Sequence, residues 1–285
     1  MLAIVFFGGI ATALVAPVVP ERTQLSESFD GAVADAASAL RTAISRGEMM
    51  VRLDFDTTLG DATYTTLKNS IEFAKGLSAD WATSVDGRLC LFFPDSGAAA
   101  LAANQWKMST EESLVPENVR VAGFPRDRLE DGDRAILVVC PRASEAAATE
   151  KLVAEAGERF IPLAMLNPEL VDMGTTGFGL AGRMLRERLI DKLTQVYCLK
   201  TLEWGALAKT YPMPYSVYQR DPAVPEGYKF LKSLARLPNS DDLEEIFEEF
   251  NPAGGDDDGP AGGGGNPLAN FARSFGKFVD GFSKL

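Results

Sequence analysis

The sequence predicts an α/β fold: a mostly parallel sheet with helices on both faces and antiparallel hairpins at one edge. In the first half of the chain, apolar runs typical of strands buried on both faces, such as residues 88–94, alternate with amphipathic helical patterns. In the second half, strand-like runs follow one another without helices between them, which favours hairpins. With 285 residues, 46% of them apolar, the chain is long enough for one large domain.

Apolar runs bounded by turn residues predict the strands, and apolar residues three and four apart predict the helices. The strands are expected at residues 50–56, 88–94, 119–124, 135–140, 160–166, 196–202, 206–211 and 215–219. The helices are expected at residues 63–81, 96–107, 144–157 and 179–193. In the first of these helices, Tyr64, Leu67 and Ile71 begin an apolar stripe that continues to Trp81 and would face the sheet.

We expect four parts along the chain. Residues 1–24 form an apolar segment that resembles a targeting presequence, and residues 25–238 form a single α/β domain. Residues 239–267 comprise an acidic helix and a linker rich in Gly, Asp and Pro. Residues 268–285 form an amphipathic helix rich in Phe.

The N-terminal apolar run, residues 2–16, is shorter than the roughly 20 residues of a comfortable membrane span. It suits the apolar region of a signal sequence, although a basic segment before it is missing. Residues 11–17, ATALVAP, resemble the junction of the bipartite plastid presequences of diatoms and related algae, with Leu14 where Phe is usual. An N-terminal membrane anchor is the alternative.

Composition excludes several kinds of chemistry. The chain has no histidine, which removes Ser-His-Asp and Cys-His nucleophiles, HExxH zinc sites and any imidazole general base. A formal net charge of −12 argues against nucleic-acid binding, because phosphate contacts need clustered Lys and Arg.

Nine carboxylates lie within residues 241–258 without a Lys or Arg. They indicate a solvated acidic face and linker, with a docking strip for a basic partner as the alternative.

The three cysteines, Cys90, Cys140 and Cys198, each lie inside an apolar run and form no CxxC pair. An odd number at this spacing indicates neither a disulfide framework nor a zinc site. We therefore predict buried free thiols in a reducing compartment.

The run DFDTT, beginning at Asp54, resembles the DxDxT signature of haloacid-dehalogenase-type phosphatases. There Asp54 would be a nucleophile and Asp56 would protonate the leaving group, with magnesium beside them. Arg52 interrupts the strand before this run, and no later strand ends in the pair of Asp residues that would bind magnesium. We therefore interpret it as an incidental pair at a strand end and keep the phosphatase as an alternative.

A glycine-rich loop precedes the helix expected at residues 179–193. Its GxGxxG run, from Gly177 to Gly182, matches the dinucleotide fingerprint, but the preceding strand is expected to end near Leu166, several residues too early. Backbone amides at a helix N-terminus with nearby guanidiniums can hold an anion; a structural turn whose arginines pair with neighbouring acids is the alternative. The candidate anion- or partner-binding loop comprises Asn167, Asp172, Gly174, Thr175, Thr176, Gly177, Gly179, Arg183 and Arg186.

The C-terminal segment carries apolar residues at alternating spacings of three and four, which predicts one helical stripe. The candidate membrane- or partner-binding residues are Leu268, Phe271, Phe275, Phe278, Phe282 and Leu285. An isolated helix of this length is only marginally stable in water, so the stripe needs a surface to cover. Three surfaces stay open: the protein's own domain, a membrane, or a groove on a partner protein.

Several stretches together resemble the plastid and cyanobacterial domain of unknown function numbered nineteen-ninety-five. The stretches are residues 63–73, residues 91–95, residues 166–172, residues 174–179 with Arg183, and residues 196–212. The resemblance implies a chloroplast setting, because the domain occurs in a photosystem II assembly factor and joined to a plastid adenylate kinase. It implies no catalytic residue.

These observations favour a non-enzymatic plastid protein that serves as an assembly or scaffolding factor for a thylakoid photosystem complex. We expect it in the chloroplast stroma, in contact with a thylakoid complex or membrane surface through the C-terminal helix. We predict no catalytic residue, cofactor, metal site or nucleic-acid partner, and the sequence names no small-molecule ligand. The alternative is a phosphate- or nucleotide-binding domain or, less favoured, a magnesium-dependent phosphatase using Asp54 and Asp56.

Overall fold

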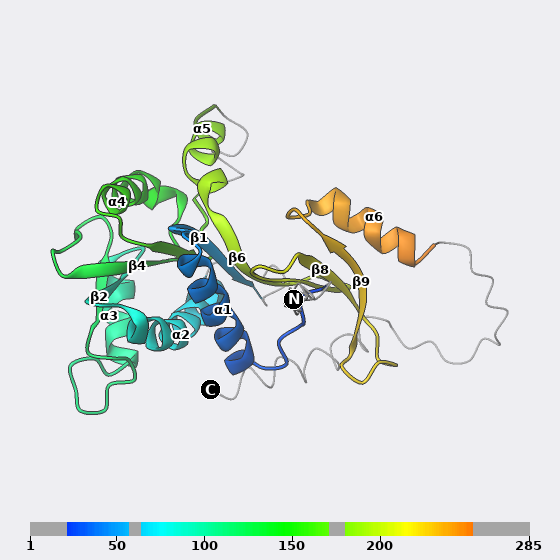
Figure 1. Ribbon diagram of the computed structural model, residues 1–285, viewed down its shortest axis with the longest axis horizontal. Helices are drawn as coiled ribbons and strands as arrows, with labels where there is room; N and C mark the ends of the chain where they lie inside the picture. Colours follow the sequence, from blue (N-terminus) through cyan, green and yellow to red (C-terminus); the bar gives the residue numbers. More distant parts are fainter. Residues whose placement is uncertain (1–21, 57–63, 171–179, 253–285) are drawn as a thin grey trace, which may run out of the picture.

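A computed structural model describes residues 22–56, 64–170 and 180–252 of the chain (Figure 1). The predictions for the apolar N-terminal segment, for Asp172 to Gly179 and for the Phe-rich C-terminal helix lie outside these residues.

One sheet forms the centre of the described structure, with the strand order β3-β2-β4-β5-β1-β6-β7-β8-β9. The strands from β3 to β6 in this order run parallel, and β6 to β9 pair antiparallel. The strands are β1 Met50–Asp56, β2 Arg88–Phe93, β3 Val119–Gly123, β4 Asp133–Val139, β5 Leu163–Leu166, β6 Thr194–Thr201, β7 Gly205–Thr210, β8 Tyr215–Arg220 and β9 Tyr228–Leu234.

Helices cover both faces of the sheet (Figure 1). On the first face lie α1 Phe29–Ser45, α2 Tyr64–Trp81 and α3 Ser96–Gln105; on the second face lie α4 Ala146–Glu158, α5 Leu180–Arg188 and α6 Ser240–Phe250. The α/β class, the mostly parallel sheet and the antiparallel edge predicted from the sequence are therefore confirmed.

Side chains at the helix starts explain where several helices begin. Ser28 accepts a hydrogen bond from the N–H of Gly31 at the start of α1, and Asp95 accepts one from Ala98 at the start of α3. At α6, Asn239 and Asp242 each accept a hydrogen bond from the backbone N–H of the other, which forms a capping box. Such caps satisfy N–H groups that have no partner inside the helix.

The structure corrects the predicted elements in three places. Helix α1 was not predicted; its buried stripe consists mainly of alanines rather than of the large apolar residues that mark α2. Strand β9 was not predicted either, because it is an edge strand that carries lysines. The strand expected at 160–166 begins only at Leu163, since Phe160 has a φ of 54° and ends the turn after α4.

The two faces of the sheet have different cores. On the first face, β1 contributes Val51, Leu53 and Phe55 to a continuous core under α1, α2 and α3, where Phe55 stacks on Phe73 with ring centroids 4.5 Å apart. The second face has two separate apolar clusters. One lies under α4 and α5 and the other under α6.

All three cysteines are buried and free, as predicted. Burial raises the pKa of Cys140 to about 12 and also raises the pKa values of Cys90 and Cys198. The thiols are therefore protonated near neutral pH and are poor nucleophiles. In residues 22–56, 64–170 and 180–252, no helix is long and apolar enough to span a bilayer.

Candidate functional site

The connections of the parallel sheet diverge at the carboxyl ends of β1 and β5. Strand β1 leads to α2 on the first face, whereas its neighbour β5 leads to α5 on the second face (Figure 1). In open α/β sheets, ligands bind where neighbouring connections leave to opposite faces. This edge is therefore the first place to search for a site.

Asn167, a candidate residue of the sequence analysis, links these two strand ends through hydrogen bonds. Its side-chain Oδ1 accepts from the N–H of Phe55 at 2.6 Å, and its Nδ2 donates to the carbonyl of Phe55 and to Ser70 Oγ, both at 2.8 Å. The amide thus takes the place of the next peptide group of a strand. Asn167 is only 7% exposed and has a φ of 47°, a conformation that Asn tolerates better than most residues. Its side chain thus has a structural role, linking the end of β5 to β1 and α2.

A polar strip on the second face of β1 and β6 separates the two apolar clusters described above. Alternation along β1 directs Arg52, Asp54 and Asp56 away from the apolar core of the first face. Arg52 Nε donates to Asp54 at 2.9 Å and Gln195 Nε2 donates to it at 2.5 Å. The hydroxyl of Tyr215 in turn donates to Gln195 Oε1 at 2.6 Å.

Asp54 is buried enough for its charge to be disfavoured. Its side chain is 18% exposed. Burial raises the pKa of Asp54 above its usual value, and the opposing charges of Arg52 and Lys200 do not cancel this shift. A carboxyl group with a raised pKa in a hollow is a recognised mark of a functional site.

A pocket of about 380 Å³, which we call the carboxyl-edge pocket, lies over this strip. Its polar lining comes from β1, from the segment after β5, from β6 and from the start of α6, and includes Asp54, Asp56, Glu169, Lys200 and Ser240. Volumes of 300–1,000 Å³ are typical of small-molecule sites. The pocket is thus large enough for a small ligand.

The lining favours a cationic or hydrogen-bonding ligand over a phosphate. Three carboxylates, those of Asp54, Asp56 and Glu169, face two cationic groups, those of Arg52 and Lys200. A phosphate would be repelled by the carboxylates. Throughout the described part of the chain, no three Cys, Asp or Glu side chains come together as metal ligands. Asp54 and Asp56 thus share a pocket without a described magnesium cluster.

The rest of the candidate loop is only partly described. Arg183 and Arg186 lie on α5 with exposed side chains, and neither lines the carboxyl-edge pocket. The glycines and threonines of the loop, together with Asp172, lie outside the described residues. Anion binding by this loop remains a prediction.

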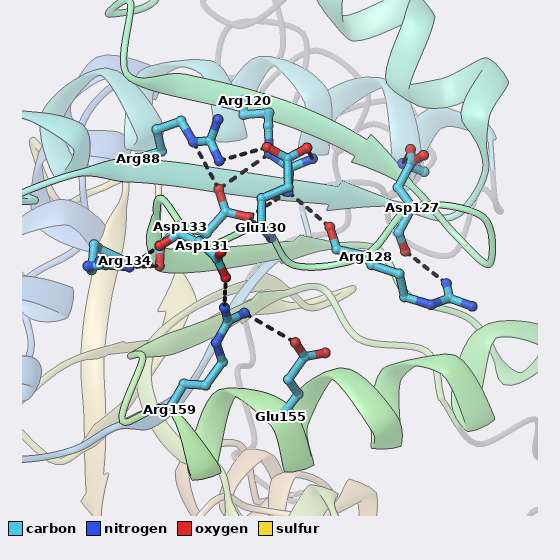
Figure 2. A network of polar contacts seen from close by, with 11 residues as sticks. Arg88, Arg120, Asp127, Arg128, Glu130, Asp131, Asp133, Arg134, Glu155 and Arg159 are labelled. Carbon is cyan, nitrogen blue, oxygen red and sulfur yellow. Dashed lines mark hydrogen bonds and ion pairs between the residues drawn. The ribbon is translucent and has the colours of Figure 1, made fainter.

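A second buried carboxylate, Asp133, lies at the opposite, amino edge of the sheet (Figure 2). Its side chain is fully buried and accepts from Arg120 Nη2 at 2.6 Å and from the N–H of Glu130 at 2.8 Å. Arg88 Nε lies 3.3 Å from it. Burial opposes its charge, but the bonds from Arg120 and Glu130 outweigh burial and lower the pKa of Asp133. This network joins β2, β3 and β4 and has a structural role.

A larger hollow of about 710 Å³ lies on the first face at the antiparallel end of the sheet. We call it the aromatic groove. Its floor is apolar and aromatic, and its exposed rim is polar. The floor comprises Leu25, Leu199, Ala206, Tyr218, Val224, Pro225, Tyr228 and Phe230, and the rim includes Arg22, Gln24, Glu27, Glu226 and Lys229.

One wall of the aromatic groove is the segment that precedes α1, which Thr23 fixes in place. Thr23 is buried; its N–H donates to Ser216 Oγ at 2.8 Å and its hydroxyl donates to the carbonyl of Pro214 at 2.9 Å. The hydroxyl of Tyr218 donates to the carbonyl of Thr23. Arg22 directly precedes Thr23 and places its guanidinium 5.3 Å from the ring centre of Phe230. The groove is therefore built on ordered backbone.

Sequence reasoning did not find either hollow as such. It named Asp54, Asp56 and Asn167, which the structure brings to the carboxyl-edge pocket, but it missed Gln195 and Lys200. One signal was available: polar residues at alternate positions of a strand whose two faces are both covered. The aromatic groove has no such signal, because its lining comes from segments separated by nearly the length of the domain.

Comparison with known proteins places the chain in a family. No curated protein matches it. Residues 27–245, most of the chain, match the model of the family described as "Domain of unknown function (DUF1995)". The resemblance found in the sequence is thereby confirmed, and the chain belongs to the DUF1995 family.

Proposed function

We propose that this protein is a non-enzymatic plastid protein, an assembly or scaffolding factor for a thylakoid photosystem complex. The observation that carries the proposal is the aromatic groove. Its apolar floor and polar rim have the character of a surface that binds an apolar segment of another chain. The plastid setting is supported by the resemblance of residues 11–17 to a plastid presequence and by the setting that the family resemblance implies.

The proposal places the protein in the chloroplast stroma and in contact with thylakoids. Disrupting its gene should lower the amount of an assembled photosystem complex on native gels while transcripts of that complex stay unchanged. Re-expressing variants in the disrupted strain distinguishes a role of the groove from a general requirement for the folded protein. Val224→Asp puts a charge into the groove lining and should fail to restore assembly.

A matched control exists in Phe160→Asp, which adds the same charge at an aromatic residue that is 84% exposed and lies outside the groove. This variant should restore assembly. Unchanged photosystem levels after disruption, or a fluorescent fusion located outside the plastid, would contradict the proposal.

A second candidate function belongs to the carboxyl-edge pocket, because Asp54 and Asp56 both line it. A magnesium-dependent phosphatase would use Asp54 as nucleophile and Asp56 as acid; hydrolysis of a generic phosphate ester that is lost in Asp54→Asn tests it.

Phosphate or nucleotide binding would instead use the glycine-rich loop. Thermal stabilisation by ATP, ADP or NAD that is lost in Arg183→Ala tests that version.

A further inference from the structure

The aromatic groove lies where no helix of the described chain covers the first face of the sheet. Helix α1 packs beside it on β6 and β7, and the groove begins at Ser26 and Glu27, just before α1 starts. From there its floor continues over β8 and β9. Several half-buried apolar residues, among them Val224, Tyr228 and Phe230, line it. An apolar occupant would bury this surface further.

The described chain ends close to this groove. Asn251 follows α6, and its Oδ1 accepts a hydrogen bond from Gln219 Nε2 at 2.8 Å. Gln219 is paired in the sheet with Lys229, a residue of the groove rim. The loop between β8 and β9 contributes Val224, Pro225 and Glu226 to the groove at this same end. The described chain therefore ends beside the β8–β9 pair that carries the groove, but on the second face, so a later segment has to pass the β9 edge to reach the hollow.

The sequence after this point has the length and composition to reach around the hairpin. Residues 253–267 are 15 residues rich in Gly, Asp and Pro. Fully extended, such a segment spans about 50 Å, and Gly-rich linkers of this length have a typical end-to-end distance of about 20 Å. A short tether of this kind gives an effective concentration on the order of millimolar. Even a weak intrinsic affinity would then fill the groove.

The segment beyond the linker has apolar side chains that could cover the floor of the groove. Its predicted helical stripe runs from Leu268 through four phenylalanines to Leu285. Aromatic rings pack favourably against an aromatic floor.

We propose that the apolar stripe of residues 268–285 docks in the aromatic groove of its own chain. This inference rests on the proposed function only for the groove as a binding surface. It needs neither the plastid nor the thylakoid assignment.

Paramagnetic relaxation in the full-length chain tests the proposal. The three native cysteines are buried, so a nitroxide reagent will modify a cysteine introduced by Ser283→Cys, and mass spectrometry verifies single labelling. Backbone amide signals of groove residues such as Leu25, Val224 and Tyr228 should lose several times more intensity than those of α3 and α4. The pair Phe275→Asp with Phe278→Asp should abolish this selective loss.

Two matched controls separate docking from added charge. Ala272→Asp with Gly276→Asp adds the same two charges off the stripe and should leave the selective loss in place. Val224→Asp in the groove should abolish it, whereas Phe160→Asp on another surface should not.

Three results would overturn the proposal. The first is intensity loss without preference for the groove, and the second is a selective loss that survives the two Phe substitutions. The third is a loss in isotope-labelled chains that carry no nitroxide when they are mixed with unlabelled nitroxide-bearing chains, which would mean that the occupant is a second copy. Photosystem assembly is measured separately, so either proposal can fail while the other holds.

Discussion

Two aspartates, fully buried Asp133 towards one edge of the sheet and half-buried Asp54 towards the other, have opposite electrostatics. Asp133 at the amino edge has two arginines and a backbone N–H beside it, and its pKa is lowered (Figure 2). Asp54, towards the carboxyl edge, has one arginine and one neutral amide, and its pKa is raised. The number of donors that compensate the charge therefore decides whether burial is tolerated. One edge holds a buried structural network, and the other holds a carboxyl group with a raised pKa beside a pocket.

The largest expected effect is loss of the Asp133 network. Asp133→Asn removes the fully buried carboxylate that Arg120 and Arg88 share and leaves both arginines only the half-exposed carboxylate of Glu130; it should cost about 3 kcal/mol of unfolding free energy. In a domain of this size that lowers the melting temperature by roughly 6–12 °C in scanning calorimetry. The control is Asp131→Asn, which breaks an exposed pair with Arg159 and should cost less than about 1 kcal/mol. Equal losses in the two variants would contradict a structural role specific to Asp133.

The next largest effect is expected from loss of the Asn167 hydrogen bonds at the carboxyl edge. Asn167→Ala leaves the buried N–H and carbonyl of Phe55 without their side-chain partner and should cost about 2 kcal/mol. Asn167→Gly loses the same hydrogen bonds but relieves the positive φ, so it should be less destabilising by about 1 kcal/mol. Denaturant titration of both variants separates the hydrogen bonds from the backbone strain. A glycine variant less stable than the alanine variant would argue against the strain.

Asp54→Asn should have a smaller effect, below about 1 kcal/mol, because the lost ion pair is offset by removal of a buried charge. Its sign depends on pH. The folded pKa of Asp54 lies above the unfolded value of 3.8, so ionisation lowers stability as pH rises through the raised pKa. Relative to wild type, Asp54→Asn should therefore gain stability as pH rises from 4 towards neutrality.

Asp133 has the opposite dependence, since a lowered pKa contributes stability above pH 3.8 that is lost as pH falls. Urea midpoints measured at several pH values for wild type, Asp54→Asn and Asp133→Asn test both signs together. Parallel pH profiles for the two variants would remove the distinction between the two edges.

The smallest effect is expected at Phe160, near the amino edge. This side chain is 84% exposed and its backbone has a φ of 54°, so it contributes little packing and holds a strained conformation. Phe160→Gly should raise stability by about 0.5 kcal/mol. A loss of stability in thermal melts would mean that the ring makes contacts that its exposure does not indicate.

The sequence predicted the fold class well and the sites only in part. Alternation of apolar runs and helical stripes depends on local spacing, which is why β1, β2 and the hairpin edge were predicted. Asn167 was named as a candidate of the binding loop. Its side chain also hydrogen-bonds the backbone of Phe55, 112 residues away, and the local sequence pattern cannot predict such a contact. The pairing of Gln195 with Asp54 is of the same kind. Long-range partners decide what a polar residue does, and one sequence does not reveal them.

The strand order also has a consequence for synthesis of the chain. Strand β1 is made first, yet both of its neighbours, β5 and β6, are made much later. Until residues up to Leu166 have left the ribosome, β1 has no sheet partner on either side, and its second neighbour, β6, is complete only at Thr201. Such non-local pairing folds slowly and exposes surfaces that aggregate. We therefore expect this chain to depend on chaperones while it is being made.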